Sequence, residues 1–167
     1  MKTAFLLACQ CGLRASEISA LKKKCVHEDH IEIKEARVAG VDGDVTKVPK
    51  SVSGYRNIPI SKSFYDLIIL SADSNGYICN MRAPAISNSW TYFRRKNGFD
   101  EDLNFHALRH YYASKCLLLG MPQKYIAELM GHSSLEMIER VYQHTFPSAM
   151  EMYAEKIRDN MNSVLQM

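Results

Sequence analysis

The chain begins with short apolar runs that are broken by a glycine. Residues 3–11 are almost entirely apolar, and Gly12 follows them directly. Because glycine readily adopts the left-handed conformation that ends many helices, this pattern predicts a short buried helix that stops at Gly12. A second helix is predicted from about Ala15 to Lys23, with Ile18 and Leu21 on its inward face.

The period of the pattern changes at His30. Residues 30–34 alternate between polar and apolar side chains, which is typical of a strand with one buried face. Residues 41–44 (VDGD) indicate a tight turn. Residues 45–49 and 55–60 are two further strand-like runs, separated by a small loop at 50–54. Together these segments predict a small three-stranded antiparallel sheet.

Helical periodicity returns after Ser61. Phe64, Leu67, Ile68 and Leu70 fall on one face of a helix. Residues 73–76 (DSNG) read as a loop. The next helix is predicted to have Pro84 in its first turn, to run to about residue 96 and to close near residue 98.

The remaining elements are also predicted to be helical. Asn104 is a suitable cap for a helix over residues 105–119, and another helix lies between Pro122 and Gly131. Ser133 with Glu136 and Ser148 with Glu151 match capping boxes that begin helices near 134–143 and 149–165. The predicted fold class is therefore mainly α with a small three-stranded antiparallel sheet (α+β).

Composition indicates a globular protein inside the cell. Hydrophobic residues make up 47% of the 167 residues and charged residues 23%. No stretch approaches the roughly 20 apolar residues of a membrane span, and the first residues lack a convincing signal-peptide cleavage site. The five cysteines, an odd number, favour reduced thiols. Cys9 and Cys11 lack a second pair at zinc-ligand spacing, and His27 and His30 near Cys25 are expected to be structural, so no metal site is expected.

The positive charge is concentrated in the first part of the chain. Residues 1–100 hold 15 Lys and Arg against 10 Asp and Glu, whereas residues 101–167 hold 6 against 8. A basic surface attracts polyanions, and nucleic acid is the first candidate. The net charge of +3 is mild, and many enzyme surfaces share it.

Four segments carry candidate chemistry. Arg14 follows a helix break, His106 and Arg109 share a helix face, His132 lies between two helices, and Tyr142 is close to a helix end. Each alone has a structural explanation, such as an ion pair, a surface patch, a cap or core packing. Together, two arginines, two histidines and a tyrosine are suited to phosphoryl transfer without a metal. Guanidiniums stabilise the phosphate charge, and a tyrosine oxygen can attack phosphorus.

The order and spacing of these segments resemble the tyrosine recombinase family, which includes phage and conjugative-transposon integrases. Residues 12–17 (GLRASE), 106–110 (HALRH), 129–134 (LMGHSS) and 142–144 (YQH) resemble its four boxes in the right order. Each box alone is a modest signal. Four in order, with a β-hairpin between the first two, are highly specific.

The resemblance implies a role for each residue. Tyr142 attacks the scissile DNA phosphate and forms a 3′-phosphotyrosyl link, while Arg14, Arg109 and His132 hold that phosphate. His106 accepts the tyrosine proton.

The resemblance also implies a lysine in the hairpin that protonates the leaving 5′ oxygen. Lys50 is the choice because of its distance from Ile58-Pro59, and Lys47 is the reserve. Glu17 and His110 are expected to orient the cleft. Neither a cofactor nor a metal is implied, because the covalent ester conserves the bond energy.

Family resemblance also implies the domain organisation and the partners. Members carry a separate DNA-binding domain before the catalytic one, whereas this chain starts 13 residues before Arg14. We therefore expect residues 1–167 to be a single catalytic domain without the N-terminal DNA-binding domains. Its expected partners are double-stranded DNA and other copies of itself, with no membrane and no small-molecule substrate, in a bacterial cytoplasm at the nucleoid.

Three alternatives and one further expectation remain. A type IB topoisomerase uses a similar set of residues, and a non-catalytic DNA-binding module or a helical interaction domain belongs to another class. In the last helix, residues 149–165, one apolar stripe contains Met150, Ala154, Ile157, Met161 and Val164. We expect this helix to dock between protomers.

Overall fold

The computed structural model describes residues 1–40, 43–48, 54–131, 135–136, 138–139, 154–158 and 161. Its helices are α1 (Lys2–Cys11), α2 (Ala15–Ala20), the 3₁₀ helix η1 (Lys23–Cys25), α3 (Lys62–Ile69), α4 (Ala83–Lys96), α5 (Ala107–Leu118) and α6 (Gln123–Met130). Its strands are β1 (His30–Ile33), β2 (Ala36–Gly40), β3 (Gly43–Lys47) and β4 (Arg56–Pro59).

Three of the predicted helix boundaries are confirmed, and a fourth is shifted by two residues. Gly12 ends α1 with a φ of 64°. The Ser61 hydroxyl accepts a hydrogen bond from the Phe64 N–H at 3.2 Å and begins α3. Pro84 lies in the first turn of α4. The Asn104 side chain accepts the Ala107 N–H at 3.1 Å, so α5 begins two residues later than predicted.

The sheet differs from the predicted three strands. The described strands form two separate antiparallel ladders, β1 with β4 and β2 with β3. In the first ladder His30 pairs with Pro59 and Ile33 with Arg56. The sequence of β2, ARVAG, has small residues and no clear alternation, so its pattern did not predict a strand. Local pairing of β2 with β3 leaves β1 to pair with the more distant β4.

The predicted helices after Gly131 lie largely outside the described residues. Residues 136, 138–139, 154–158 and 161 are helical, and they fall inside the two predicted ranges. The predicted capping serines Ser133 and Ser148 lie outside the described residues, as does Glu151.

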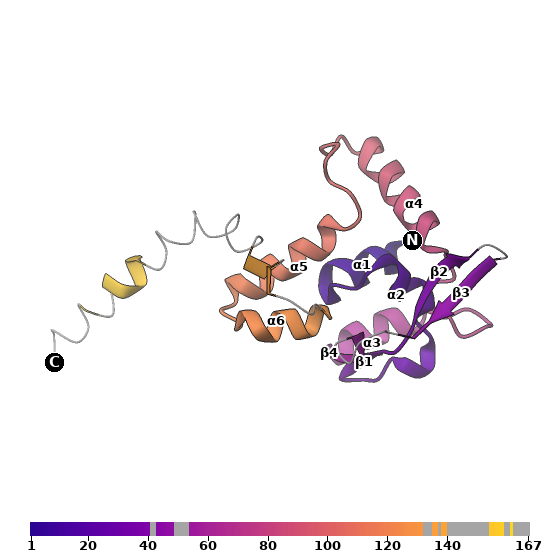
Figure 1. The fold of residues 1–167 in the computed structure, drawn as a ribbon, viewed down its shortest axis with the longest axis horizontal. Coiled ribbons are helices and arrows are strands. Elements are labelled where there is room, and N and C mark those ends of the chain that lie inside the picture. Colours follow the sequence, from indigo (N-terminus) through magenta and orange to yellow (C-terminus); the bar gives the residue numbers. More distant parts are fainter. Residues whose placement is uncertain are drawn as a thin grey trace.

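Buried apolar side chains form two clusters. The first surrounds α1 and α2 and draws in β1, β4 and α4; among its members are Leu7, Ile18, Ile31, Ile58 and Trp90. The second lies between α5 and α6 and includes Tyr112, Ile126 and Met130. Figure 1 shows α1 and α2 at the centre, with α5 and α6 on one side and β2 and β3 on the other. The segment that joins α1 to α2 therefore lies where the two clusters meet.

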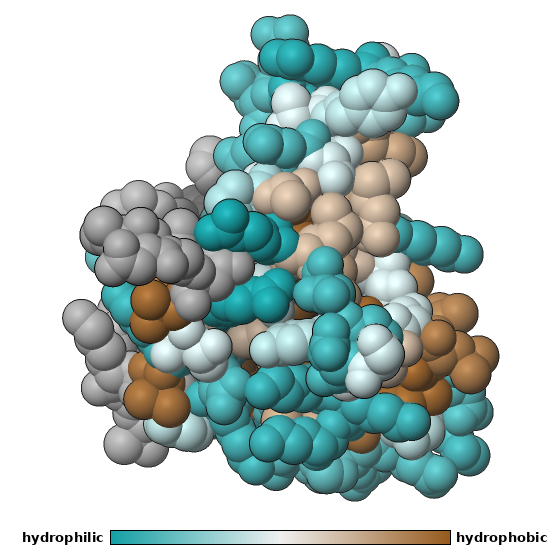
Figure 2. Space-filling model, turned by 90° about the vertical axis from the view of Figure 1, so that its right-hand side faces the viewer, coloured by the Kyte–Doolittle hydropathy of each residue, from teal (hydrophilic) through white to brown (hydrophobic). Residues whose placement is uncertain are grey.

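The surface polarity and the free cysteine thiols agree with what the composition predicts. The face on the side of β2, β3 and α4 is mostly hydrophilic, with small hydrophobic patches (Figure 2). All five cysteines are free, as predicted. In the part of the chain that the structure describes, we find no helix with the length and apolarity of a membrane span.

Gly12 allows α1 to pack closely on α5, and this packing gives a test of the fold. A Cβ atom at Gly12 would lie 2.5 Å from Tyr112 Cδ1, whereas one at Gly120, with a φ of 77°, meets nothing within 4 Å. Both residues have a left-handed backbone, so Gly120→Ala should lower the free energy of unfolding by roughly 1 kcal/mol. Gly12→Ala should cost roughly 1–3 kcal/mol more, because it also overpacks the junction. Urea unfolding of the two variants measures the difference, and equal losses would contradict the close packing.

Candidate active site

The carboxylate of Glu17 lies at the centre of the site, on the first turn of α2. Its Oε2 atom accepts the backbone N–H of Arg14 at 2.8 Å, and its Oε1 atom accepts Arg14 Nη1 at 2.9 Å. These bonds satisfy one free donor at the start of α2 and place a negative charge where the helix dipole favours it. Arg14 is thereby held immediately before the helix, with its side chain 35% exposed.

Arg56 reaches the same carboxylate from β4. Its Nη1 atom lies 3.0 Å from Glu17 Oε1 and its Nη2 atom 2.9 Å from Oε2, so the guanidinium and the carboxylate meet as two parallel forks. Both side chains are only 6% exposed. A buried pair with this geometry is stabilised by charge-assisted hydrogen bonds, and it leaves each partner strongly dependent on the other.

Arg109 enters from α5 and is the most buried of the three arginines. Its side chain is 1% exposed, and its Nη1 atom lies 4.0 Å from Glu17 Oε2. Nη1 also donates to the Gly12 carbonyl, and Nη2 donates to the Met130 carbonyl. Arg109 thus links the end of α1, the start of α2 and the end of α6.

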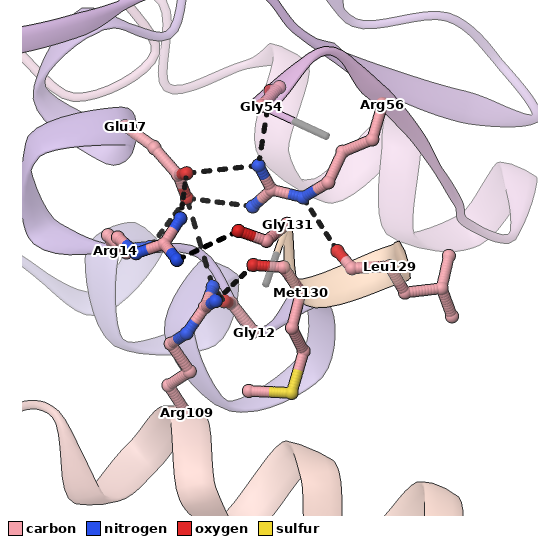
Figure 3. Close-up of polar contacts among 9 residues, drawn as sticks. All are labelled: Gly12, Arg14, Glu17, Gly54, Arg56, Arg109, Leu129, Met130 and Gly131. Carbon is pink, nitrogen blue, oxygen red and sulfur yellow. Dashed lines mark hydrogen bonds and ion pairs between the residues drawn. The ribbon is translucent and has the colours of Figure 1, made fainter. Parts of the chain in front are cut away.

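The C-terminal end of α6 is held by all three arginines (Figure 3). Arg56 Nε donates to the Leu129 carbonyl at 2.6 Å, Arg109 to the Met130 carbonyl, and Arg14 Nη2 to the Gly131 carbonyl at 3.1 Å. The last carbonyls of a helix lack partners within the helix and carry its negative dipole end, so cations are favourable there. Three successive carbonyls are therefore each fixed by a different arginine.

The charges of this cluster shift the pKa of Glu17. Burial alone would raise this pKa, but the Arg56 hydrogen bonds and the charges of Arg56, Arg14 and Arg109 outweigh it and lower the pKa to about 2. Burial, followed by the charge of Arg14, lowers the pKa of Arg109 to about 9, while Glu17 opposes that shift. Glu17 and Arg109 are therefore both charged at neutral pH. Three guanidiniums face one carboxylate, so positive charge is in excess.

The two histidines of α5 lie beside Arg109. The rings of His106 and His110 meet edge to face, 4.9 Å apart between centroids. Burial lowers the pKa of both, and for His106 the nearby His110, Arg109 and Arg14 lower it further. Because both values fall below the ordinary 6.5, the neutral imidazole predominates at pH 7, which is the form that can accept a proton.

The structure brings together the predicted residues that it describes, with one exception. Arg14, Glu17 and Arg109 converge, and the pKa of His106 responds to both arginines. The reserve lysine, Lys47, is exposed at the end of β3, opposite Ala36. Lys50, His132 and Tyr142 lie outside the described residues, so their roles stay predictions.

Sequence reasoning did not single out Arg56 as a member of the site. The available signal was its position two residues before Ile58 in an alternating strand, which puts both side chains on one face. A cation on the same face as a buried isoleucine needs a buried anion. Glu17 is that anion, but the partners are 39 residues apart in sequence.

Chemically, the arrangement can bind a tetrahedral oxyanion. Excess positive charge, a partly exposed guanidinium at Arg14 and neighbouring neutral imidazoles are the groups that a phosphodiester and its transition state require. Because carbonyls and Glu17 already fix the arginines, little reorganisation is needed when an anion binds.

Comparison with known proteins agrees with this chemistry. A model described as the phage integrase family matches residues 1–148. A tyrosine recombinase XerC-like protein of Caldanaerobacter subterraneus is 25% identical over 95% of this chain and 49% of its own length. The transposase from transposon Tn916 of Enterococcus faecalis is 25% identical over 87% of this chain and 42% of its own. The chain thus spans half or less of the length of these relatives.

Solved structures share the fold. The Tn1549 transposon integrase, in complex with circular intermediate DNA, superposes with a TM-score of 0.76 at 21% identity, covering 93% of this chain and 59% of the other. The catalytic domain of bacteriophage HP1 integrase gives a TM-score of 0.58 at 23% identity, covering 92% and 79%. These likenesses confirm the predicted fold class, mostly helical with a small antiparallel sheet.

The pKa of Glu17 predicts how stability depends on pH. A depressed pKa stabilises the folded state above the ordinary value of 4.5, and this contribution is lost as the pH falls towards 2. Glu17→Gln should therefore lower the free energy of unfolding by about 3 kcal/mol at pH 7, and the gap to the wild type should narrow between pH 4.5 and 2. Urea unfolding across this range measures the gap. The exposed Glu101→Gln variant is the control, and a gap that persists unchanged to pH 2 would contradict the argument.

Removal of Arg56 should destabilise the fold, because it leaves Glu17 buried without its main partner. We expect Arg56→Ala to lower the free energy of unfolding by roughly 3–5 kcal/mol at pH 7. The matched control is Lys62→Ala, which breaks ion pairs with Glu28 and Asp66 on the open surface and should cost much less. Chemical denaturation measures the free energy of unfolding of both variants. A comparable decrease in both would show that the buried ion pair does not stabilise the fold.

Proposed function

This chain belongs to the phage integrase family, which confirms the predicted family, and we propose that it is the catalytic part of a site-specific DNA recombinase. It would cut and rejoin DNA through a 3′-phosphotyrosyl intermediate. The observation that carries the proposal is the convergence of Arg14, Arg56 and Arg109 around Glu17. The two arginines expected to hold the phosphate are already fixed beside one another.

In the proposed reaction, the Tyr142 oxygen bonds to the scissile phosphorus and the bond from phosphorus to the 5′ oxygen breaks. Arg14 and Arg109, with His132, offset the charge that develops on the phosphoryl oxygens. His106 takes the tyrosine proton, and its lowered pKa supports this role because the ring is neutral at pH 7. Lys50 gives a proton to the departing 5′ oxygen. Rejoining reverses these steps.

We propose that this transfer needs no metal. The guanidiniums supply the positive charge that a divalent cation supplies in other phosphoryl-transfer enzymes. The ester at Tyr142 keeps the energy of the phosphodiester, so no high-energy cofactor is required either. Glu17 acts through the arginines by fixing their positions, and His110 acts through its contact with His106.

Two alternatives are less well supported. Type IB topoisomerases use a similar residue set, but the relatives named above are a recombinase, a transposase and an integrase. A non-catalytic DNA-binding module would have no use for neutral histidines beside fixed arginines.

The partners follow from the same proposal. The Tn1549 integrase was solved with DNA, and we propose that double-stranded DNA is the substrate of this chain as well. We also propose that residues 1–167 form one catalytic domain that acts as two or more copies on DNA, at the bacterial nucleoid. In the predicted terminal helix, Ile157 and Met161 are 59% and 64% exposed, which fits an apolar stripe that the described residues leave uncovered.

The nucleophile gives a direct test. A suicide DNA substrate, which traps the covalent intermediate, should form an adduct with a full-length version of the protein. Tyr142→Phe should abolish the adduct, because it removes only the attacking oxygen, and should change stability by no more than about 1 kcal/mol. Arg14→Ala should slow adduct formation by orders of magnitude. A covalent adduct in the Phe variant would show that Tyr142 is the wrong residue.

The terminal helix gives a separate test of assembly. Truncation after Pro147 in a full-length version should weaken cooperative assembly on DNA and reduce cleavage, because the docking stripe is removed. Ile157→Glu with Met161→Glu should have the same effect without shortening the chain, whereas Glu155→Ala on the opposite face should have little. Gel shifts and cleavage assays measure both. Unchanged cooperativity in the truncated protein would rule out the docking role.

A further inference from the structure

A tight turn before β1 brings two histidines together. The His27 N–H donates to the His30 carbonyl at 2.8 Å, and Val26 forms a β-bridge with Ile31. In such a turn the first and last residues face each other across the ends of two strands. The two imidazole rings are accordingly stacked, with centroids 4.4 Å apart and an interplanar angle of 19°.

Glu32 adds a carboxylate to this pair. It lies two residues after His30 in β1, so both side chains fall on the same face of the strand. The ligand atoms of His27, His30 and Glu32 all lie within 4.8 Å of one another. Nε2 of His27 is buried and has no hydrogen-bond partner among the described residues, although Glu32 Oε2 lies 3.4 Å from it.

A further carboxylate orients the second imidazole. Asp29 Oδ1 lies 2.7 Å from Nδ1 of His30, which leaves Nε2 of that ring free to bind elsewhere. A carboxylate bonded to the far nitrogen of a histidine is the arrangement that fixes the ring in metal sites. Lys34 disfavours the binding of a cation, because its positively charged Nζ atom lies 2.6 Å from Glu32 Oε2 and competes for that carboxylate.

We propose that His27, His30 and Glu32 bind one borderline divalent cation, with Zn²⁺ as the best fit. Imidazole and carboxylate ligands suit zinc, nickel and copper, whereas Mg²⁺ and Ca²⁺ prefer oxygen alone. Three protein ligands leave one tetrahedral position for water. Bonds of about 2.0–2.2 Å require the three ligand atoms to draw closer by rotation of the three half-buried side chains.

The site is separate from the phosphate chemistry. His30 pairs with Pro59 at one end of the β1–β4 ladder, and Arg56 lies at the other end, opposite Ile33. A bound cation would tie the turn to β1 and stabilise the strand pair that carries Arg56. Its role is structural, and the proposal stands independently of the DNA reaction.

Zinc titration of the tag-free 167-residue chain tests the proposal, with a chromogenic chelator as competitor. We expect saturable binding of one Zn²⁺ and weaker binding of Mg²⁺. Loss of an orienting partner typically costs 10- to 100-fold in affinity, so Asp29→Ala should fall within about that range. His27→Ala and His30→Ala remove direct ligands and should exceed it.

Two further variants keep the result independent of misfolding. Lys34→Gln should tighten zinc binding severalfold, because it frees the carboxylate of Glu32, and a misfolded protein would not gain affinity. The double variant His106→Ala/His110→Ala removes the other adjacent imidazole pair and should leave zinc affinity unchanged. Equal affinity in the wild type and His27→Ala would overturn the proposal. So would the absence of saturable binding, or a loss of binding in Cys25→Ser but not in the histidine variants.

Discussion

The structure depends on one buried carboxylate among three guanidiniums. Glu17 is almost inaccessible to water, and such a charge is tolerated in a protein interior only when it is paired and fully hydrogen-bonded. Arg14, Arg56 and Arg109 come from three parts of the chain and meet at this group. Apolar contacts are not directional, so on their own they would not fix the position of one apolar cluster relative to the other. The charged junction fixes their relative position.

This junction prepares the site before any substrate arrives. Mobile arginine side chains on the surface would lose conformational entropy on binding a phosphate. The three arginines of this site are already held by backbone carbonyls and by Glu17. The same contacts stabilise the end of α6, because three carbonyls there accept hydrogen bonds from the arginines. The same side chains therefore support the fold and would hold the phosphate in the proposed function.

Local signals in the sequence predicted most of the fold, while long-range pairings stayed hidden. Gly12, Ser61, Pro84 and Asn104 act within a few residues of themselves, so their caps and boundaries could be read directly. The strand β2 was not predicted because its small side chains show no clear alternation of polar and apolar residues. Because β2 pairs with β3, β1 pairs with β4, and the strands form two ladders instead of a single sheet. In the site, Arg14, Glu17, His106 and Arg109 were identified by their order and motif context. The role of Arg56 was not predicted, because it depends on a contact with Glu17 that forms only when the chain folds. The turn at 27–30 is similar: the spacing of its histidines is unremarkable until Glu32 joins them on one face.

The triple hold on the end of α6 also affects how this sequence can drift. Each arginine there supports the fold, and under the proposed function Arg14 and Arg109 also serve chemistry on DNA. A copy that had lost the proposed DNA reaction would still lose stability on a change at Arg14, Arg56 or Arg109, because these side chains hold the end of α6. The arginines would then persist after the proposed reaction was lost. In such a copy their presence reports on folding, and the tyrosine proposed as the nucleophile is the better indicator of activity.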